Sequence, residues 1–493
     1  EPASTSNDDG WGDPPAATNG DDDDESRKRK FNDLESNDFH TDNTAAAADA
    51  FYSGLKRDLG TRADSRLFHM RAFNGWVKAT QIQELDPRTS GKRKAPMRVL
   101  DLACGKGGDL GKWTLHDRGI ANYVGVDVAR GSLKDAAIRA RKMRNKLKRC
   151  TFTCADLGSD VPGRFRTPKH KKMQKLSSWS LHGEGTYAQG DPKFDMVRGG
   201  GIALDDRFDV ISIQFAIHYM MSTRARARRF FQTASQLLEV GGNLICTTID
   251  ARIVLNRLMN LGLDYHFVDP NQTKFEKAVV TAGNGQCRIT FEPETVKKVF
   301  KARDKRTGEF DAEELFGLEY SFSLVEGTDH AAGVGDAVNL PEWLNPIPVL
   351  KALAEEAGME LESAENFHEF YNNRRSPMSF PQAHAALYNM KVLDRNGSIP
   401  TDNWDISRMY VAIKFRKVKE SKIVLVEEED KVDDDDDDDE EEEKPPPPPP
   451  NPKLFPMAMM KAKRIVGHDR WQLLDGDEKK KLIHEQLVKM SAG

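Results

Sequence analysis

The stretch RVLDLACGKGGDLGKW, residues 98–113, contains the clearest structural signal in the chain. The apolar run at 98–102 predicts a β-strand, and Gly105, Gly107 and Gly108 follow directly after it. Because glycine has no Cβ atom, its backbone turns tightly and lets a ligand come close. The stretch therefore predicts a strand, a glycine-rich turn and a helix, with a ligand lying against the turn.

The spacing and charge of this turn narrow the class of ligand. A dinucleotide-binding fingerprint places a third glycine five residues after the first, where this chain has Leu110. A phosphate-binding P-loop needs Ser or Thr after Gly-Lys, and here Lys106 is followed by glycine. Asp101 and Asp109 lie beside the turn and would repel phosphate. A neutral or cationic ligand fits better than a pyrophosphate, which disfavours a nicotinamide dehydrogenase.

Further strand candidates follow along the chain, at 123–126, 151–154, 208–213 and 243–247. Helical patterns at 132–148 and 224–238 lie between them, and Gly241-Gly242 predicts a turn before the last strand. Strands that alternate with helices predict βαβ units, and so an α/β fold with a doubly wound, mostly parallel sheet. Ligands of such sheets bind at the carboxyl ends of the strands, near the point where strand order reverses.

Two carboxylates lie where later strands end. Asp127 closes YVGVD, 22 residues beyond Gly105, where it could accept hydrogen bonds from both hydroxyls of a ribose. Asp156 in TCADL suits the exocyclic amine of an adenine. Each could instead be only a helix cap. Together with a turn that disfavours phosphate, they favour an adenosine that carries a positive sulfonium, S-adenosylmethionine, as cofactor.

Longer stretches resemble one family specifically. Motif 98–113 alone is similar to class I methyltransferases in general, but further stretches resemble the eukaryotic mRNA cap guanine-N7 methyltransferases, of a fungal type. They are FHMRAFNGWVKATQI (68–82), CGKGGDLGKW (104–113), ISIQFAIHYM (211–220), VNLPEWLNPIPVLKALAEEAGMEL (338–361) and ISRMYVAIKF (406–415). The resemblance implies a Rossmann-like class I methyltransferase fold over 51–415. It also implies methyl transfer from S-adenosylmethionine to N7 of the terminal guanosine of the mRNA 5′ cap.

The resemblance further implies the residues of two ligand sites. Those expected to contact the methyl donor are Lys78, Ala103, Gly105, Asp127, Asp156, Gln214 and Tyr219. Those expected to contact the cap are Asn74, Lys106, Lys112, Arg139, His218, Glu342 and Tyr410, and Asn74 could touch either ligand. Ala103 departs from the glycine of many relatives, which is tolerable where only its main chain is used.

The chemistry of guanine determines what these residues have to do. Guanine N7 exposes an in-plane lone pair at neutral pH, so no proton has to leave before it attacks. No general base is therefore expected, and catalysis depends on in-line alignment of the reacting atoms. His218, Tyr219 and Glu342 are expected to position the guanine and to favour the positive charge that it gains. No metal is expected, because Cys150 and Cys154 have no second pair of ligands at finger spacing.

The charge distribution separates acidic flanks from a basic body. Residues 1–25 contain nine acids and no Lys or Arg, and residues 427–443 contain fifteen acids against Lys431 alone. The chain total of −5 therefore leaves a net charge of +18 on the rest. Such a body suits a polyanionic partner, although solvation alone could explain scattered Lys and Arg.

Composition predicts four parts. Residues 1–48 are expected to be a disordered acidic tail, in which the basic cluster Arg27–Lys30 indicates a nuclear localisation signal. Within 51–415, residues 158–206 lack sustained periodicity and are expected to form an inserted loop. Residues 418–452 are expected to be an acidic and polyproline linker, and 453–493 a small helical segment.

The sequence and the family resemblance also predict a compartment and partners, and they leave two alternative functions open. No run approaches 18 apolar residues, so no membrane span is expected, and five cysteines suit a reducing compartment. The resemblance implies a nuclear protein whose partners are the capped 5′ end of nascent mRNA, other capping enzymes and the transcription machinery. Two alternatives stay open: a methyltransferase that uses S-adenosylmethionine on another substrate, and a non-catalytic scaffold that binds caps or RNA.

Overall fold

The computed structural model divides into two units, residues 1–426 and 427–493. The structure describes residues 65–88, 95–143, 145–147, 149–158, 163–166, 173–176, 186–188, 202–203, 205–261, 275–304, 306–325, 336–421, 455–466, 471–472, 479–483 and 486. The expected tail at 1–48, and the expected linker apart from 418–421, lie outside these residues.

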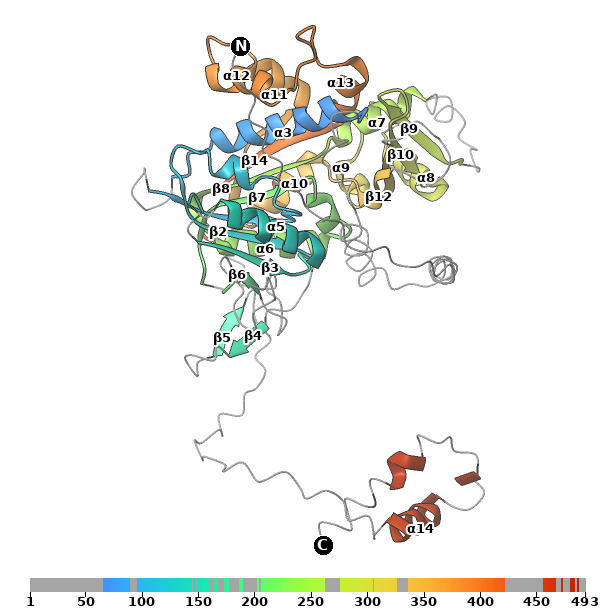
Figure 1. The fold of residues 1–493 in the computed structure, drawn as a ribbon. Coiled ribbons are helices and arrows are strands. Elements are labelled where there is room, and N and C mark those ends of the chain that lie inside the picture. Colours follow the sequence, from blue (N-terminus) through green and yellow to red (C-terminus); the bar gives the residue numbers. More distant parts are fainter. Residues whose placement is uncertain are drawn as a thin grey trace, which may run out of the picture. The chain divides into compact units, whose positions relative to one another are not determined.

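The first unit is built on an eight-stranded sheet of order β13-β14-β8-β7-β1-β2-β3-β6 (Figure 1). Five neighbours run parallel: β8 (Leu238–Ile249), β7 (Phe208–Gln214), β1 (Met97–Leu102), β2 (Ile120–Asp127) and β3 (Cys150–Cys154). Three strands pair antiparallel at the two sides of this core: β6 (Thr186–Ala188), β13 (Met359–Asn366) and β14 (Tyr410–Lys417). The expected doubly wound, mostly parallel sheet is confirmed.

Burial on both faces explains why the parallel strands read as apolar runs. Along β1, Val99 packs into one core cluster, whereas Leu100 and Leu102 pack into another, as the two-residue period of a strand requires. Helices α4 (Leu110–Trp113) and α5 (Arg130–Lys142) supply side chains to the first cluster, and α6 (Arg224–Leu237) and α10 (Ile347–Glu356) to the second.

Two elements differ from the expected boundaries by five residues or more at one end, β8 and α5. Strand β8 begins at Leu238, so the pair Gly241-Gly242 lies inside the strand instead of forming a turn before it. The pairing of β7 with β8 shifts its register there, and Gly241 has φ +86°, which a residue with a Cβ atom rarely adopts. Helix α5 ends at Lys142, six residues before the expected end at 148.

The expectation that 158–206 is only a loop is wrong for its described residues. Strands β4 (Gly163–Arg166) and β5 (Met173–Leu176) pair as an antiparallel hairpin, and β6 adds to the main sheet beside β3. These strands are three or four residues long. A segment this short shows too few repeats of the alternation that identifies a strand in sequence.

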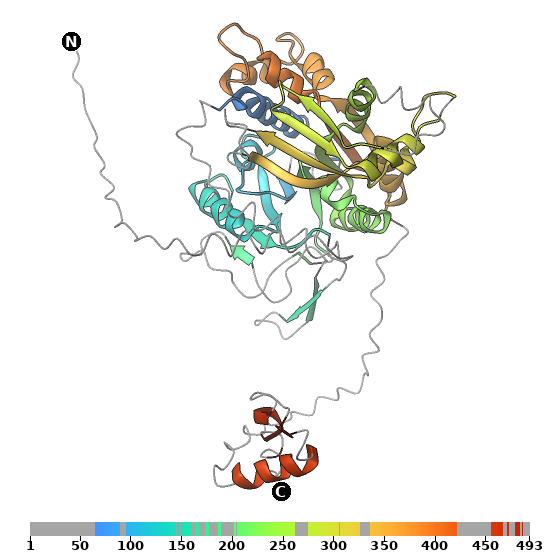
Figure 2. The same cartoon turned by 90° about the vertical axis from the view of Figure 1, so that its right-hand side faces the viewer.

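A second, four-stranded antiparallel sheet has the order β12-β11-β10-β9 (Figure 2). It consists of β9 (Ala278–Ala282), β10 (Cys287–Phe291), β11 (Glu319–Val325) and β12 (Asp336–Trp343). Alternate residues of β9 and β11 are buried, so one face packs on a core shared with α7 (Ala251–Asn260), α8 (Pro293–Lys301) and α9 (Ala312–Leu315). In this sheet Tyr320 of β11 pairs with Glu342 of β12.

Helix α3 (Phe68–Gln83) lies against α11 (Phe367–Arg374), α12 (Pro381–Asn389) and α13 (Thr401–Ser407), as Figure 1 shows. Its buried face includes Phe73 and Trp76, whose rings stack with centroids 5.7 Å apart and contact aromatic side chains of α11. This aromatic packing fixes the position of the helix that carries Asn74 and Lys78.

The second unit contains α14 (Phe455–Val466), within the segment expected to be helical. Ala458 and Ala462 on α14 form a small apolar cluster with Trp471 and Ile483.

Ala103, the first residue after β1, has φ +51°. This left-handed conformation costs a residue with a Cβ atom about 1–2 kcal/mol, and glycine avoids that cost but loses about 0.5–1 kcal/mol more entropy on folding. We therefore expect Ala103→Gly to be as stable as the wild type or slightly more stable. The β-branched Ala103→Val should lose about 1–3 kcal/mol in urea unfolding. A valine variant as stable as the wild type would contradict this conformation.

Candidate active site

The carboxyl ends of four neighbouring parallel strands meet at one edge of the main sheet. Leu102 of β1 pairs with Val126 of β2 on one side and with Ile213 of β7 on the other, and Asp127 pairs with Cys154 of β3. After β3 the chain adds β6 on the far side of β3 and then crosses to β7, on the other side of β1, so strand order reverses at β1. This is the place at which ligands of doubly wound sheets bind.

The glycine turn after β1 leaves room for a ligand. A Cβ atom added at Gly105 or Gly108 would meet nothing within 4 Å among the described residues, so both glycines face open space. At Gly107, which has φ +66°, an added Cβ atom would lie 2.6 Å from Leu110 and 3.2 Å from Ala136 of α5. The turn is thus packed against α5 on one side and open on another.

Asp127 fastens this turn to the second strand. Its Oδ2 accepts the backbone N–H of Gly105 at 2.8 Å, and its Oδ1 accepts that of Ala129 at 2.8 Å. Asp156 accepts the backbone N–H of Gly158 at 2.8 Å and lies 3.7 Å from the guanidinium of Arg226. Both carboxylates therefore accept local backbone N–H groups, as helix-capping residues do. They lie at the positions where contacts with the methyl donor were expected.

A buried ion-pair network lies beside the turn. Lys78 of α3 and Lys112 of α4 each place Nζ 2.8 Å from the carboxylate of Asp109. Burial opposes the charge of Asp109, but the two lysines outweigh it and lower its pKa to about 2. This network joins two residues from the expected donor and cap sites through a carboxylate that was not assigned to either.

Asp101 lies in the opposite electrostatic situation. It is 2% exposed on β1, and Oη of Tyr123 donates to its Oδ2 at 2.7 Å. Burial, and next the negative charge of Asp109, raise the pKa of Asp101 to about 7. A carboxyl group with a pKa of about 7 therefore lies on the strand that leads into the glycine turn.

The residues that were expected to position the guanine gather on the other side of β7. His218 and Tyr219 lie on the short helix η2 (Ile217–Met220), with ring centroids 4.3 Å apart. Nε2 of His218 lies 3.3 Å from Oε1 of Glu342, which comes from the second sheet. Oε2 of Glu342 accepts the hydroxyl of Tyr320 at 2.8 Å. The tertiary structure therefore brings His218 and Glu342 together across 124 residues of sequence.

Tyr410 and Lys78 approach this cluster through Phe215. The ring of Tyr410 meets that of Phe215 edge to face with centroids 5.2 Å apart, and Nζ of Lys78 lies 5.7 Å from the Phe215 centroid. Phe215 has φ +58°, which turns the chain sharply between β7 and η2. Burial, followed by the charges of Cys287 and Glu342, raises the pKa of Tyr410 well above its ordinary value, so its hydroxyl stays protonated.

The other expected residues contact different partners. Nε2 of Gln214 donates to Oε1 of Gln81 at 3.3 Å, and its own Oε1 accepts the hydroxyl of Thr247. Lys106 pairs with Asp135 at 2.9 Å, and Arg139 donates to the carbonyl of Gly107 at 3.2 Å. Asn74 donates to the sulfur of Met70, and its buried Oδ1 has no partner among the described residues.

Tyr320, Thr248 and Asn345 are members of the cluster that sequence reasoning missed. Nδ1 of His218 lies 3.4 Å from the hydroxyl oxygen of Thr248, which also accepts from Nδ2 of Asn345 at 3.2 Å. The signal for Tyr320 was the alternation of EYSFSLV, which predicts a strand with tyrosine on its buried face. Its pairing with Glu342 depends on strand register, which that alternation does not give.

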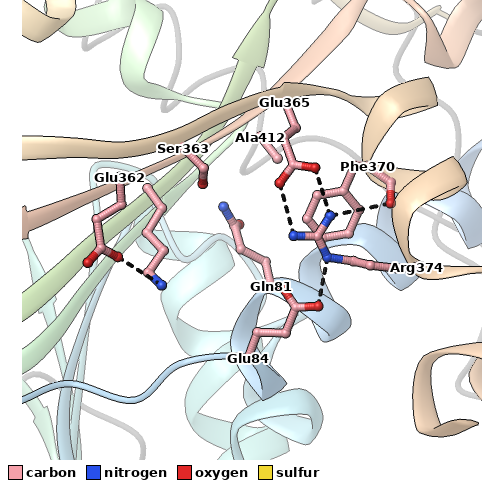
Figure 3. A pocket seen from close by; sticks show the side chains of 9 residues that line it. Gln81, Glu84, Glu362, Ser363, Glu365, Phe370, Arg374 and Ala412 are labelled. Carbon is pink, nitrogen blue, oxygen red and sulfur yellow. Dashed lines mark hydrogen bonds and ion pairs between the residues drawn. The ribbon is translucent and has the colours of Figure 1, made fainter. Parts of the chain in front are cut away.

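A cavity of about 410 Å³ lies elsewhere (Figure 3). None of the predicted site residues lines it; its walls are Gln81, Glu84, Glu362, Ser363, Glu365, Phe370, Arg374, Ala412 and Lys414. Arg374 pairs with Glu84 at 2.6 Å and with Glu365 at 2.9 Å, and Lys414 pairs with Glu362 at 2.9 Å. Its charges are thus largely neutralised within the protein, and the cavity is not the candidate active site.

The part of the chain that the structure describes contains no group of three or more His, Cys, Asp or Glu side chains that could hold a metal ion. Among its helices, none combines the length and the apolar character that a membrane span requires.

Comparisons with known proteins match the chain to one family. The model of the mRNA (guanine-N(7))-methyltransferase domain matches residues 35–418. mRNA cap guanine-N(7) methyltransferase 1 of Oryza sativa subsp. japonica is 30% identical over 379 residues, which cover 75% of this chain and 80% of that protein. The mRNA cap guanine-N(7) methyltransferase of Caenorhabditis elegans is 30% identical and covered over 66% of both chains. That of Schizosaccharomyces pombe is 24% identical, with 73% and 79% covered.

Solved structures give a weaker similarity. A putative S-adenosylmethionine dependent methyltransferase from Listeria monocytogenes matches with a TM-score of 0.34 and 11% identity, over 71% of this chain and 99% of that one. The fold assignment therefore rests on the strand order and the glycine turn described above.

Strand order and glycine turn together define a class I methyltransferase that uses S-adenosylmethionine. With 384 of 493 residues matched, the chain belongs to the mRNA (guanine-N(7))-methyltransferase family. The resemblance seen in sequence is confirmed, and the chain is an enzyme, not a scaffold or a dehydrogenase. The fungal subdivision stays a prediction, because plant relatives match at 29–30% identity and fungal ones at 24–26%.

The raised pKa of Asp101 gives a test of the buried charges under the turn. The folded state binds this proton more tightly than an unfolded chain, whose carboxyl titrates at about 3.9, so the contribution of Asp101 to the stability of the wild type is lost as pH rises from about 4 to 7. Asp101→Asn carries no charge and still accepts the Tyr123 hydroxyl. We expect the unfolding temperature of Asp101→Asn, measured relative to that of the wild type, to be higher at pH 8 than at pH 5.

Asp109→Asn is the matched control, because the pKa of Asp109 is lowered and its charge is stabilised by two lysines. This variant should lose stability at pH 8 instead of gaining it. If the unfolding temperatures of Asp101→Asn and of the wild type changed with pH in the same way, Asp101 would not bind its proton more tightly in the folded state.

Proposed function

We propose that this chain methylates N7 of the terminal guanosine in the 5′ cap of mRNA, with Glu342 at the centre of the guanine site. The observation that carries the proposal is the buried carboxylate of Glu342, fixed by Tyr320 on one oxygen and facing His218 with the other. It is 3% exposed and has no Lys or Arg partner among the described residues. A buried carboxylate without a basic partner favours a ligand that donates hydrogen bonds.

Guanine has the matching donors on one edge. Its N1–H and N2–H groups lie side by side and can both donate to a carboxylate. These bonds strengthen as the ring becomes cationic, so Glu342 would favour the transition state over the ground state. His218, Tyr219 and Tyr410 are proposed to contact or pack against the base, since they lie on the elements around Glu342.

The donor site is proposed at the sheet edge. Its residues would be Lys78, Ala103, Gly105, Asp127, Asp156, Gln214 and Tyr219, with Asn74 close to Lys78 on α3. The open space before Gly105 and Gly108 fits a ligand of this kind, and the carboxylates of Asp127 and Asp156 lie at adjacent strand ends. When bound, S-adenosylmethionine supplies an activated methyl group.

Three cations are proposed to bind the triphosphate bridge of the cap. Lys106, Lys112 and Arg139 lie around the glycine turn, and each now contacts an acceptor of the protein: Asp135, Asp109 and the Gly107 carbonyl. Charged donors of this type bond strongly to phosphate oxygens, and Arg can do so with two N–H groups at once. The proposed cap site therefore runs from the second sheet toward α5.

No residue is assigned as a general base. The guanine N7 lone pair is available at neutral pH, so the residues of the site need only hold the base in line and exclude water. The proposed role of the chain is thus positioning together with electrostatic stabilisation.

Place and partners extend the proposal. The basic cluster Arg27–Lys30 lies outside the described residues, and its sequence supports a nuclear location, where capped transcripts are made. The capped 5′ end of nascent mRNA is the proposed substrate, and other capping enzymes and the transcription machinery are proposed partners.

Methyl transfer to defined caps tests the function directly. We expect the purified chain to transfer labelled methyl from S-adenosylmethionine to GpppG-capped RNA, with 7-methylguanosine released on nuclease digestion. ApppG-capped RNA of the same sequence is the matched control and should remain unlabelled at the cap.

The rate of the chemical step should be flat between about pH 6.5 and 8.5, because no catalytic proton moves. A rise with a single pKa, seen equally in Asp101→Asn, would reveal a base.

Variants of the carboxylate test the guanine site. Glu342→Gln keeps an acceptor for the Tyr320 hydroxyl but loses the charge, so we expect kcat/KM for the cap to fall about 10–100-fold while the fold persists. Tyr320→Phe keeps the ring but removes the bond that orients Glu342. We expect it to raise KM for the cap several-fold and leave KM for the methyl donor unchanged. Wild-type turnover in Glu342→Gln would refute the assignment.

A further inference from the structure

The exposed side of α5 and of the turn that follows it is strongly basic. Residues 130–149 contain nine Lys or Arg and a single acid, Asp135, which pairs with Lys106. Exposed cations recur along the outer side of this segment. Four of them, Lys134, Lys142, Lys146 and Arg149, are named the α5 ridge.

The fold holds this ridge in a defined shape. The inner side of α5 is buried through Leu133, Ala136 and Ala140, so the cations lie on the opposite side. Beyond the helix, the backbone N–H groups of Lys146 and Leu147 donate to the carbonyl of Met143 at 2.8 and 3.0 Å. Leu147 is fully buried and anchors the turn. Attraction to the helix dipole explains Lys142 in the last turn, but it does not explain Lys146 and Arg149 beyond it.

The ridge continues the proposed cap site. Arg139 of α5 donates to the carbonyl of Gly107, and an added Cβ atom at Gly107 would lie 3.2 Å from Ala136 of the same helix. Helix α5 is therefore packed directly on the glycine turn around which the proposed triphosphate ligands lie. Lys142 follows Arg139 by three residues, which places both on neighbouring positions of one helix side.

We propose that the α5 ridge binds the phosphate backbone of the RNA body, beyond the cap. This inference rests on the proposed function, since the position of the cap sets where the transcript begins. Rows of Lys and Arg bind single-stranded nucleic acid through its phosphates, without reading its sequence. Ile138, 38% exposed, is the large apolar side chain on the exposed side of α5, and no described aromatic residue lies between the cations to stack on bases. Binding to the ridge is accordingly independent of RNA sequence.

The test compares substrates with and without an RNA body. In the variant Lys142→Gln/Lys146→Gln/Arg149→Gln, we expect KM for a capped 20-nucleotide RNA to rise about tenfold at low salt. KM and kcat for the GpppG dinucleotide should stay within about twofold of the wild type. Each RNA phosphate that the variant no longer neutralises lowers the slope of log affinity against log salt by about 0.7, so the slope for RNA should fall by about 2.

A matched control removes the same charge from other elements. Lys298→Gln/Lys351→Gln/Lys419→Gln changes exposed lysines on α8, on α10 and after β14. This variant should methylate the capped 20-mer with nearly the wild-type KM. An equal rise of KM in the control would show a general effect of net charge and would overturn the proposal, as would an unchanged KM in the ridge variant. Loss of activity on GpppG in the ridge variant would overturn it too.

Direct binding separates this inference from the proposed function. Fluorescence anisotropy with an uncapped 20-nucleotide RNA measures the ridge without methyl transfer, and the ridge variant should bind about tenfold more weakly than both the wild type and the control variant. If no capped substrate is methylated but this difference persists, the proposed function fails and the ridge stands. If methylation is observed and the three proteins bind RNA equally, RNA binding by the α5 ridge is refuted and the proposed function is supported.

Discussion

Parallel hydrogen bonding between β1 and its two neighbours is the constraint on which the site depends. It aligns Leu102 with Val126 and with Ile213, so the residues that follow these strands meet at one edge. The carboxylate of Asp127 then binds the first backbone N–H of the glycine turn and holds it to that edge. Without this alignment the glycine turn, Asp127 and Gln214 would not lie at one edge of the sheet.

Electrostatics divides the site into two unlike halves. Beside the glycine turn, Lys78 and Lys112 hold the pKa of Asp109 low, while burial raises that of Asp101 close to neutral. On the other side of β7, the carboxylate of Glu342 is buried, accepts a hydrogen bond from Tyr320 and lies 3.3 Å from His218. One half is therefore an ion-pair network within the protein. The other is a buried carboxylate that could accept hydrogen bonds from a ligand. This contrast fits a methyl-donor site of fixed geometry next to the proposed guanine site, where the substrate would supply the missing hydrogen bonds.

Local patterns could be predicted from sequence because they depend on neighbouring residues. Five apolar runs gave the parallel strands, and three glycines gave the turn, within a few residues of their observed positions. The exceptions have physical causes: Gly241 tolerates a positive φ inside β8, and β4, β5 and β6 are too short to show alternation. Gly105, Asp127 and Asp156 could be named from the glycine turn and the strand ends, but the cap residues could be named only through family resemblance, since nothing local distinguishes Glu342 from a surface acid or His218 from a structural histidine.

The sequence by itself therefore determined the order of the five parallel strands along the chain, the glycine turn, the basic body and the family. Only the tertiary structure decided that Glu342, Tyr320 and His218 meet, because their contact requires a second sheet whose strand register is set by packing. It also decided that Tyr123 donates a hydrogen bond to Asp101 and that Lys78 reaches Asp109. Contacts between residues far apart in the chain depend on how whole elements pack, and that information is spread over the entire core rather than written in any one motif.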